Sequence, residues 1–254
     1  MIQAGNKTAM EIAAAFFKGN VSLSLSAIAI LIVIALFKLL PIIGIVFAFA
    51  YPILSFAIQI YVAREVPTLQ NAKEMEEVAR RTRLKELFTR HLDIAAGGFL
   101  GFFLILMLLS MIFMGLLSSS IDIQTLSGDN MEAFSAAFSA SGALGTLLLF
   151  LLLGMWLGYL MPGVMGEVIL AQSFNEAFRK SLLLFSPSFW KRTFTRNYFT
   201  LILLWSMIIF VAALLFSWIA LSILLLPIAL VGIYFLSLYN AVIYVFAREA
   251  LSDK

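Results

Sequence analysis

Long apolar stretches separated by short polar segments form the main pattern of this chain. A helix needs roughly 20 apolar residues to cross a bilayer, and its backbone polar groups must be paired within the crossing segment. The apolar runs are continuous rather than alternating, which excludes the pattern of a membrane β-barrel. The sequence therefore predicts an all-α polytopic membrane protein, built as a single integral membrane domain over 1–254. The six predicted transmembrane helices lie at about 21–37, 42–62, 94–117, 142–171, 198–221 and 223–246.

Three polar segments are predicted to form cytoplasmic amphipathic helices, and these lie at about 8–18, 70–92 and 174–190. The longest of them has no glycine or proline and places Glu76, Glu77 and Glu86 each four residues before an arginine. Opposite charges at this spacing meet on a helix surface and stabilise it. The apolar face of these helices is expected to rest either on the membrane surface or on another part of the protein.

Lysine and arginine residues gather in the segments on one side of the predicted membrane. The predicted external loop, 118–141, holds Asp122, Asp129 and Glu132 but no lysine or arginine. Because cytoplasmic loops carry the excess of basic residues, both termini are predicted to be cytoplasmic. Lys38 falls on the outer side, where we expect its side chain to reach the interface. The basic residues expected at the cytoplasmic interface are Lys18, Arg64, Arg90, Arg196 and Arg248.

The composition supports a membrane protein and narrows its chemistry. The chain is 63% hydrophobic, and its mean hydropathy of +1.04 is too high for a soluble globular domain. The net charge of +3 is explained by the basic cytoplasmic loops, so we expect no nucleic acid partner. The absence of cysteine from the sequence excludes disulfides, iron–sulfur clusters and thiol catalysis.

Short internal matches predict a repeat. Phe-Phe-Lys at 16–18 and Phe-Thr-Arg at 88–90 and 194–196 each stand directly before an odd-numbered span, and Ala-Arg-Glu occurs at both 63–65 and 247–249. These matches predict three copies of one unit, an interfacial helix followed by a transmembrane hairpin. The alternative is that aromatic and basic residues mark the start of any membrane helix.

Polar residues inside the predicted spans are the candidates for a ligand or ion site, because burying such groups in lipid is costly. Glu167 is the one acidic residue well inside a span, and the repeat places Gln59 at the equivalent position, with Asn240 about one turn from its counterpart. These three could converge to bind a polar head group or a cation, or to relay a proton. Alternatively, Glu167 pairs with a loop arginine, and the two amides join neighbouring helices.

Glycine and proline residues mark predicted packing or hinge positions. Pro162, Gly163 and Gly166 predict a kink in the fourth span, because proline cannot donate a helical hydrogen bond. Small residues four apart let two membrane helices approach closely. This spacing occurs in the third and fourth spans, at Gly97, Gly101, Gly154 and Gly158.

Enzyme signatures are missing from the sequence, so we expect no catalytic residue, no metal ligand and no cofactor. The single histidine, His91, stands at a predicted membrane interface without a second metal ligand at a suitable spacing. The sequence also lacks a phosphate-binding glycine loop, a nucleophile elbow and a dinucleotide fingerprint.

The hairpin plan, the aromatic-basic starts of the spans and the segment Asn-Glu-Ala-Phe-Arg at 175–179 carry a family resemblance. On these features the chain resembles six-span bacterial families, namely the YciC-like proteins and the membrane domain found with glycerophosphodiester phosphodiesterases. The resemblance implies the bacterial inner membrane and supplies no catalytic residues. Glu176-Ala177 also resembles the EAA loop of ABC importer permeases, although the glycine and Leu-Pro that follow in that motif are missing here.

The sequence thus favours a non-enzymatic inner-membrane protein that binds membrane lipids or assembles with other membrane components, as a homo-oligomer or with another subunit. The alternative is a small transporter, or a permease subunit of an ATP-driven complex, with its site near Glu167.

Overall fold

The computed structural model describes residues 4–120, 143–219 and 225–252, and every regular element in these ranges is a helix. Five helices are long and apolar enough to cross a membrane. The number is six when the first two helices, which are bent by 94° at their junction, count as one span. The predicted all-α class is therefore confirmed for the described residues, with five or six helices long and apolar enough to span a membrane. Most of the predicted external loop, 118–141, lies outside the described residues.

Consecutive long helices contact each other in three pairs, and the last long helix also packs against members of the other two pairs. Each long helix overlaps one predicted span. The pairs are α2 (Val21–Phe37) with α3 (Ile43–Glu65), α6 (Leu92–Ser120) with α8 (Ala143–Ile169), and α11 (Arg196–Ile219) with α12 (Leu226–Ser252).

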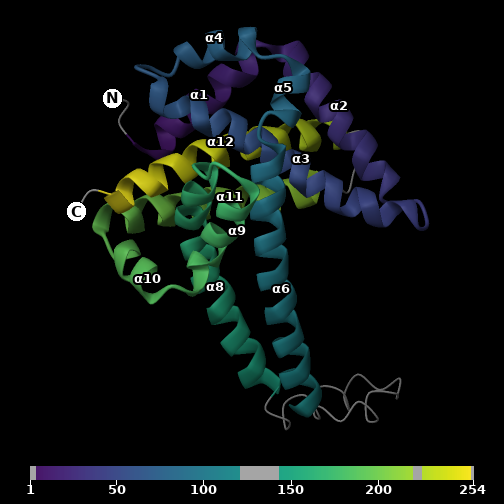
Figure 1. Cartoon of the computed structure of the whole chain (residues 1–254), viewed down its shortest axis with the longest axis vertical. Helices are drawn as coiled ribbons and strands as arrows, with labels where there is room; N and C mark the ends of the chain where they lie inside the picture. The colour runs from purple at the N-terminus through teal and green to yellow at the C-terminus, as the bar shows by residue number, and fades with distance from the viewer. Residues whose placement is uncertain (1–3, 121–142, 220–224, 253–254) are drawn as a thin grey trace.

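The pairs spread apart as they leave a common core. In Figure 1, α6 and α8 run side by side away from the rest of the fold, whereas α2 and α3 extend in another direction. Burial follows this arrangement: α8 is buried at Leu160, Val164 and Val168, near the core, but exposed at Leu148 and Leu152, farther out. The outer halves of the pairs therefore present apolar surface that the described residues do not cover.

Short helices close the end of the core at which both described termini lie (Figure 1). Helix α1 (Asn6–Gly19) packs against α12 and against α4 (Glu74–Arg81). Its apolar residues Ile12 and Phe16 are fully buried, as is Met75 of α4. Since apolar side chains gain most from burial away from water, the apolar faces of these two amphipathic helices rest on protein.

The segment predicted as one helix over 70–92 is instead broken. It forms α4 and α5 (Leu84–Thr89), after a short helix η1 (Val66–Thr68) that follows α3. The break falls at Thr82, whose backbone is extended and whose hydroxyl donates to the Val78 carbonyl at 2.7 Å and lies 3.1 Å from the Tyr61 hydroxyl. The side chain thus competes with the helix for backbone groups.

The break also redirects two of the charge pairs expected along that helix. Glu76 and Arg80 pair as expected, at 3.6 Å. Arg81 and Arg90 instead meet Glu65 at the end of α3, at 3.3 and 3.7 Å. Folding the segment back at Thr82 therefore brings both arginines to one carboxylate on α3.

The segment predicted as one helix over 174–190 is also divided, into α9 (Phe174–Ser181), the short helix η3 (Leu182–Phe185) and α10 (Pro187–Thr193). The residue before a proline disfavours helical backbone, and Ser186 is extended. Pro187 then occupies the first helical position, where its missing N–H costs nothing, and the Ser186 hydroxyl accepts a hydrogen bond from the Phe189 N–H at 3.4 Å.

Candidate functional site

The two amides expected near Glu167 each join α12 to a different neighbour. Gln59 of α3 donates from Nε2 to the Ser237 hydroxyl at 2.9 Å, and Trp205 of α11 donates from Nε1 to Asn240 Oδ1 at 2.8 Å. Interhelical hydrogen bonds of this kind contribute about 0.6 kcal/mol on average. Within the described ranges, no hydrogen bond or ion pair links Gln59, Glu167 and Asn240 to one another.

Glu167 lies between two arginines at the end of α8 nearest the core. Its carboxylate oxygens are 3.8 Å from Arg192 Nη2 of α10 and 3.9 Å from Arg248 Nε of α12. Only 18% of the Glu167 side chain is exposed, whereas the arginine side chains are 44% and 41% exposed. Pairs with such solvated partners contribute about 1 kcal/mol or less, so Glu167 acts chiefly as a link between three helices.

Arg64 is the basic residue with the most developed contacts. It lies in the last turn of α3. Its guanidinium reaches the end of α8, where Nε donates to the Ile169 carbonyl at 2.8 Å, and Nη2 donates to the carbonyl of Ala171 just beyond that helix. The last carbonyls of a helix have no partner within it. Arg64 therefore satisfies the end of α8 and fixes it against α3.

The other basic residues predicted at the cytoplasmic interface lie on different helices and make different contacts. Lys18 lies in the last turn of α1 and lines a surface groove between α1 and α4. Arg90 pairs with Glu65 and stands 5.7 Å from the centroid of the Tyr61 ring. Arg196 begins α11 and is exposed. Together with Arg64 and Arg248 these residues surround the end of the core where the short helices lie.

A tyrosine from α11 enters the hydrogen-bond ladder of α8 beside Pro162. The Tyr198 hydroxyl accepts from the Gly163 N–H at 3.2 Å and donates to the Tyr159 carbonyl at 2.8 Å. These two groups would bond each other in an undisturbed helix. Helix α8 continues past this point to Ile169. At the predicted hinge, the Tyr198 hydroxyl is therefore inserted between the backbone N–H of Gly163 and the carbonyl of Tyr159.

Replacing Tyr198 with phenylalanine is expected to lower the free energy of unfolding by about 1–2 kcal/mol, because two buried backbone groups lose their shared partner. The measurement is thermal unfolding of the purified protein in detergent. Tyr51→Phe is the matched control, since among the described residues the Tyr51 hydroxyl has no hydrogen-bond partner. Equal melting temperatures for Tyr198→Phe and wild type would contradict the bridging role.

The glycines predicted to mediate packing divide into two groups. Gly97 and Gly101 of α6 face α9, because an added methyl group would overlap the Phe174 carbonyl oxygen or the Ser181 hydroxyl. Gly166 meets α12 in the same way, at the Tyr244 carbonyl oxygen. Around Gly154 and Gly158, by contrast, a methyl group would meet no described atom within 4 Å.

Glu176, in the segment that resembles a permease loop, closes the start of α9. Ser173 accepts from the Glu176 N–H at 3.4 Å, and Glu176 accepts from the Gln172 N–H at 2.7 Å. The hydrogen bond from Gln172, and a second from Lys180, lower the pKa of Glu176, so the carboxylate is charged at neutral pH. Ser173 thus caps α9, and Glu176 resembles the acidic member of a capping box, except that its bond goes to the N–H of the residue before the cap.

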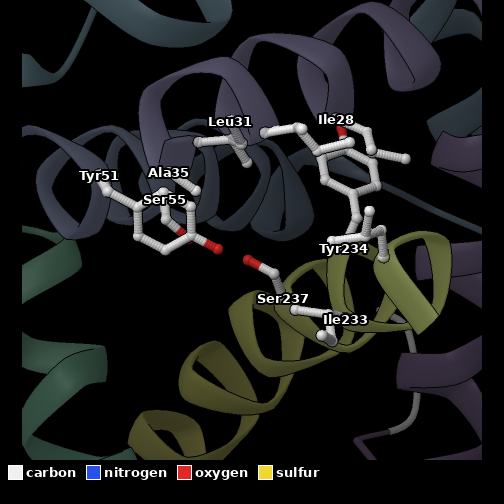
Figure 2. A pocket seen from close by; sticks show the side chains of 10 residues that line it. Ile28, Leu31, Ala35, Tyr51, Ser55, Ile233, Tyr234 and Ser237 are labelled. Carbon is white, nitrogen blue, oxygen red and sulfur yellow. The ribbon is translucent and has the colours of Figure 1, made fainter. Parts of the chain in front are cut away.

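Among the pockets formed by the described residues, two lie between helices of different pairs. The first is an apolar crevice of about 330 Å³ between α8 and α11, lined by Met155, Gly158, Tyr159, Phe199, Ile202, Leu203, Trp205 and Ser206. The second, in Figure 2, is lined by α2, α3 and α12 and contains several side-chain hydroxyls. Apolar pockets with a few polar groups are typical of small-molecule sites.

Sequence reasoning missed the polar residues of the second pocket, although a signal for them exists. Tyr51, Ser55 and Gln59 are spaced four apart on α3, so they share one helix face. On α12, Tyr234 and Ser237 are three apart and line the same pocket, which is the same kind of signal.

Among the described residues, no group of three or more histidine, cysteine, aspartate or glutamate side chains could hold a metal ion. Comparisons of the chain with protein-family models, curated proteins and solved structures return no match.

Proposed function

We propose that this protein is a non-enzymatic integral membrane protein that binds membrane lipid, with an acyl chain in the crevice between α8 and α11. The observation that carries the proposal is this apolar opening of about 330 Å³, which is formed where the third helix pair diverges from the second. The volume lies at the low end of the range for small-molecule pockets, roughly 300–1,000 Å³. Its lining is almost wholly apolar, which suits a hydrocarbon chain.

Gly158 gives the crevice its depth. It lies on the wall formed by α8, and a methyl group there would meet no described atom within 4 Å. Trp205, on the wall formed by α11, directs its indole N–H away to Asn240. An acyl chain that fills this space would make dispersion contacts with the apolar side chains of both walls. These contacts would favour one ordered chain over disordered lipid in the crevice.

The bacterial inner membrane, with both termini cytoplasmic, is part of the same proposal. It is supported by the basic residues around the core, since Arg64, Arg90 and Arg248 all lie at the end where the short helices gather. Excess positive charge marks the cytoplasmic side. The uncovered apolar halves of the helix pairs then lie toward the outer leaflet.

A threefold repeat of a short helix and a helix pair is also proposed. The order of elements supports it: α1 precedes α2 and α3, α5 precedes α6 and α8, and α10 precedes α11 and α12. The two Ala-Arg-Glu matches support it further, because Arg64 and Arg248 both reach α8 from neighbouring pairs.

Replacing Gly158 with leucine tests the lipid-binding proposal. The new side chain would fill the crevice, so we expect the lipid-bound fraction to fall several-fold in native mass spectrometry of the gently extracted protein. Gly145→Leu is the matched control, because it adds the same side chain to the same helix at another site with no described atom within 4 Å.

The same measurement separates lipid binding from the alternative of a transport complex. Unchanged lipid retention in Gly158→Leu would overturn the crevice as a lipid site. A co-purifying ATPase would favour the permease subunit and direct attention to α9 and Glu167.

A further inference from the structure

A polar stripe runs along α3 inside its apolar span. Tyr51, Ser55 and Gln59 lie on one face of this helix, and the hydrogen bond from Gln59 to Ser237 turns that face toward α12. A helix rises 1.5 Å per residue, so the stripe covers roughly 12 Å of the span. Polar groups at this depth are costly in lipid unless they find partners.

The stripe borders the pocket of Figure 2, which lies between α3, α2 and α12. The hydroxyls of Tyr51 and Ser237 point toward one another across it (Figure 2). Its free volume is about 60 Å³, and one side is open. A water molecule needs at least about 10–15 Å³ by this measure, so the pocket admits a small polar group and adjoining carbons. The apolar wall consists of Ile28, Leu31, Ile32, Ala35, Leu230 and Ile233.

The hydroxyls at this pocket retain unused hydrogen-bonding capacity. Among the described residues, neither Tyr51 nor Ser55 has a hydrogen-bond partner for its hydroxyl, and Ser237 accepts one bond, from Gln59. The buried hydroxyl of Tyr234, on the same lining, instead lies beside the Ser24 hydroxyl of α2, so Tyr234 is not counted among these groups. Several neutral donors and acceptors thus lie where bulk water is absent.

We infer that this pocket binds the hydroxyl end of a neutral long-chain lipid, whose hydrocarbon part leaves through the open side. None of the ten lining residues carries a charge, so an ionic head group would have no charged partner among the lining side chains. Lys38, the nearby cation, instead stands over the Tyr51 ring at 3.8 Å. A hydroxyl both donates and accepts, so it matches side-chain hydroxyls, which can also do both. The site is separate from the α8–α11 crevice.

Paired photoreactive probes test this inference on the full chain in detergent. One probe is a long-chain alcohol with a diazirine near the hydroxyl, and the other is the corresponding alkane. We expect the alcohol to label the peptides containing Leu31 and Ile233 about tenfold more than the alkane does, since two hydrogen bonds of about 0.7 kcal/mol each give that ratio.

The double variant Tyr51→Phe/Ser55→Ala is expected to remove this preference while alkane labelling and the melting temperature stay unchanged. Ser217→Ala, whose hydroxyl donates to the Ala213 carbonyl of its own helix at 2.8 Å, should behave like wild type. Ala35→Leu should block both probes by filling the pocket. Equal labelling of wild type by alcohol and alkane would overturn the inference and leave water as the partner of the hydroxyls. Because Gly158→Leu leaves this pocket intact, the two sites succeed or fail separately.

Discussion

Gly166→Ala is expected to destabilise the protein by about 3 kcal/mol, at the upper end of the cost of overpacking. The added methyl group would overlap the Tyr244 carbonyl oxygen and come within 2.8 Å of Arg248 Cβ. The first of these is a backbone atom of α12, which cannot move away as a side chain end can. The two helices would have to separate at the buried centre of the fold. By the scaling for chains of this size, the melting temperature should fall by roughly 6–12 °C.

Gly154→Ala is the matched control for this prediction. It makes the same substitution on the same helix, at a position where the methyl group meets no described atom within 4 Å. We expect its melting temperature in detergent to equal that of wild type or exceed it, because alanine favours helix over glycine. If Gly166→Ala and Gly154→Ala had the same melting temperature, the inferred close contact of α8 with α12 at Gly166 would be wrong.

The long helices could be predicted from sequence because hydropathy depends on local composition alone. The span expected at about 198–221, for example, corresponds to α11, Arg196–Ile219. The break before Pro187 follows a local rule, since the residue before a proline disfavours helical backbone, whereas the break at Thr82 has no such local signal. The break at Thr82 involves the Tyr61 hydroxyl from α3, a contact that exists only once the chain has folded.

The contact partners of these side chains were harder to predict from sequence than the positions of the helices that carry them. The Gly97 and Gly101 pair identifies a surface that something approaches closely, yet the partner is the short helix α9 rather than another span. Gln59 and Asn240 were identified as polar groups within spans, but they bond Ser237 and Trp205 instead of converging on Glu167. A repeat can predict equivalent depth, whereas the direction of a side chain depends on helix rotation.

Arg64 stands at the junction of the first and second helix pairs, and its removal is expected to have the second large effect. Arg64→Ala would leave the Ile169 and Ala171 carbonyls without their partner. Hydrogen bonds from a charged donor contribute about 1.5–3 kcal/mol. We expect a loss of about 2 kcal/mol in the free energy of unfolding, because the Arg64 side chain is only partly buried and water can replace part of the interaction.

Arg81→Ala serves as the control for Arg64, because it removes the same side chain from an exposed ion pair with Glu65. The Arg81 side chain is 69% exposed, so its loss should cost less than about 1 kcal/mol. Arg64→Lys should recover less than half of the lost stability, since a single ammonium group does not reproduce the two donors of a planar guanidinium. Both are measured by thermal unfolding in the same detergent. Full rescue by lysine would show that positive charge at the end of α8 matters rather than the two hydrogen bonds, and the capping role of Arg64 would then be wrong.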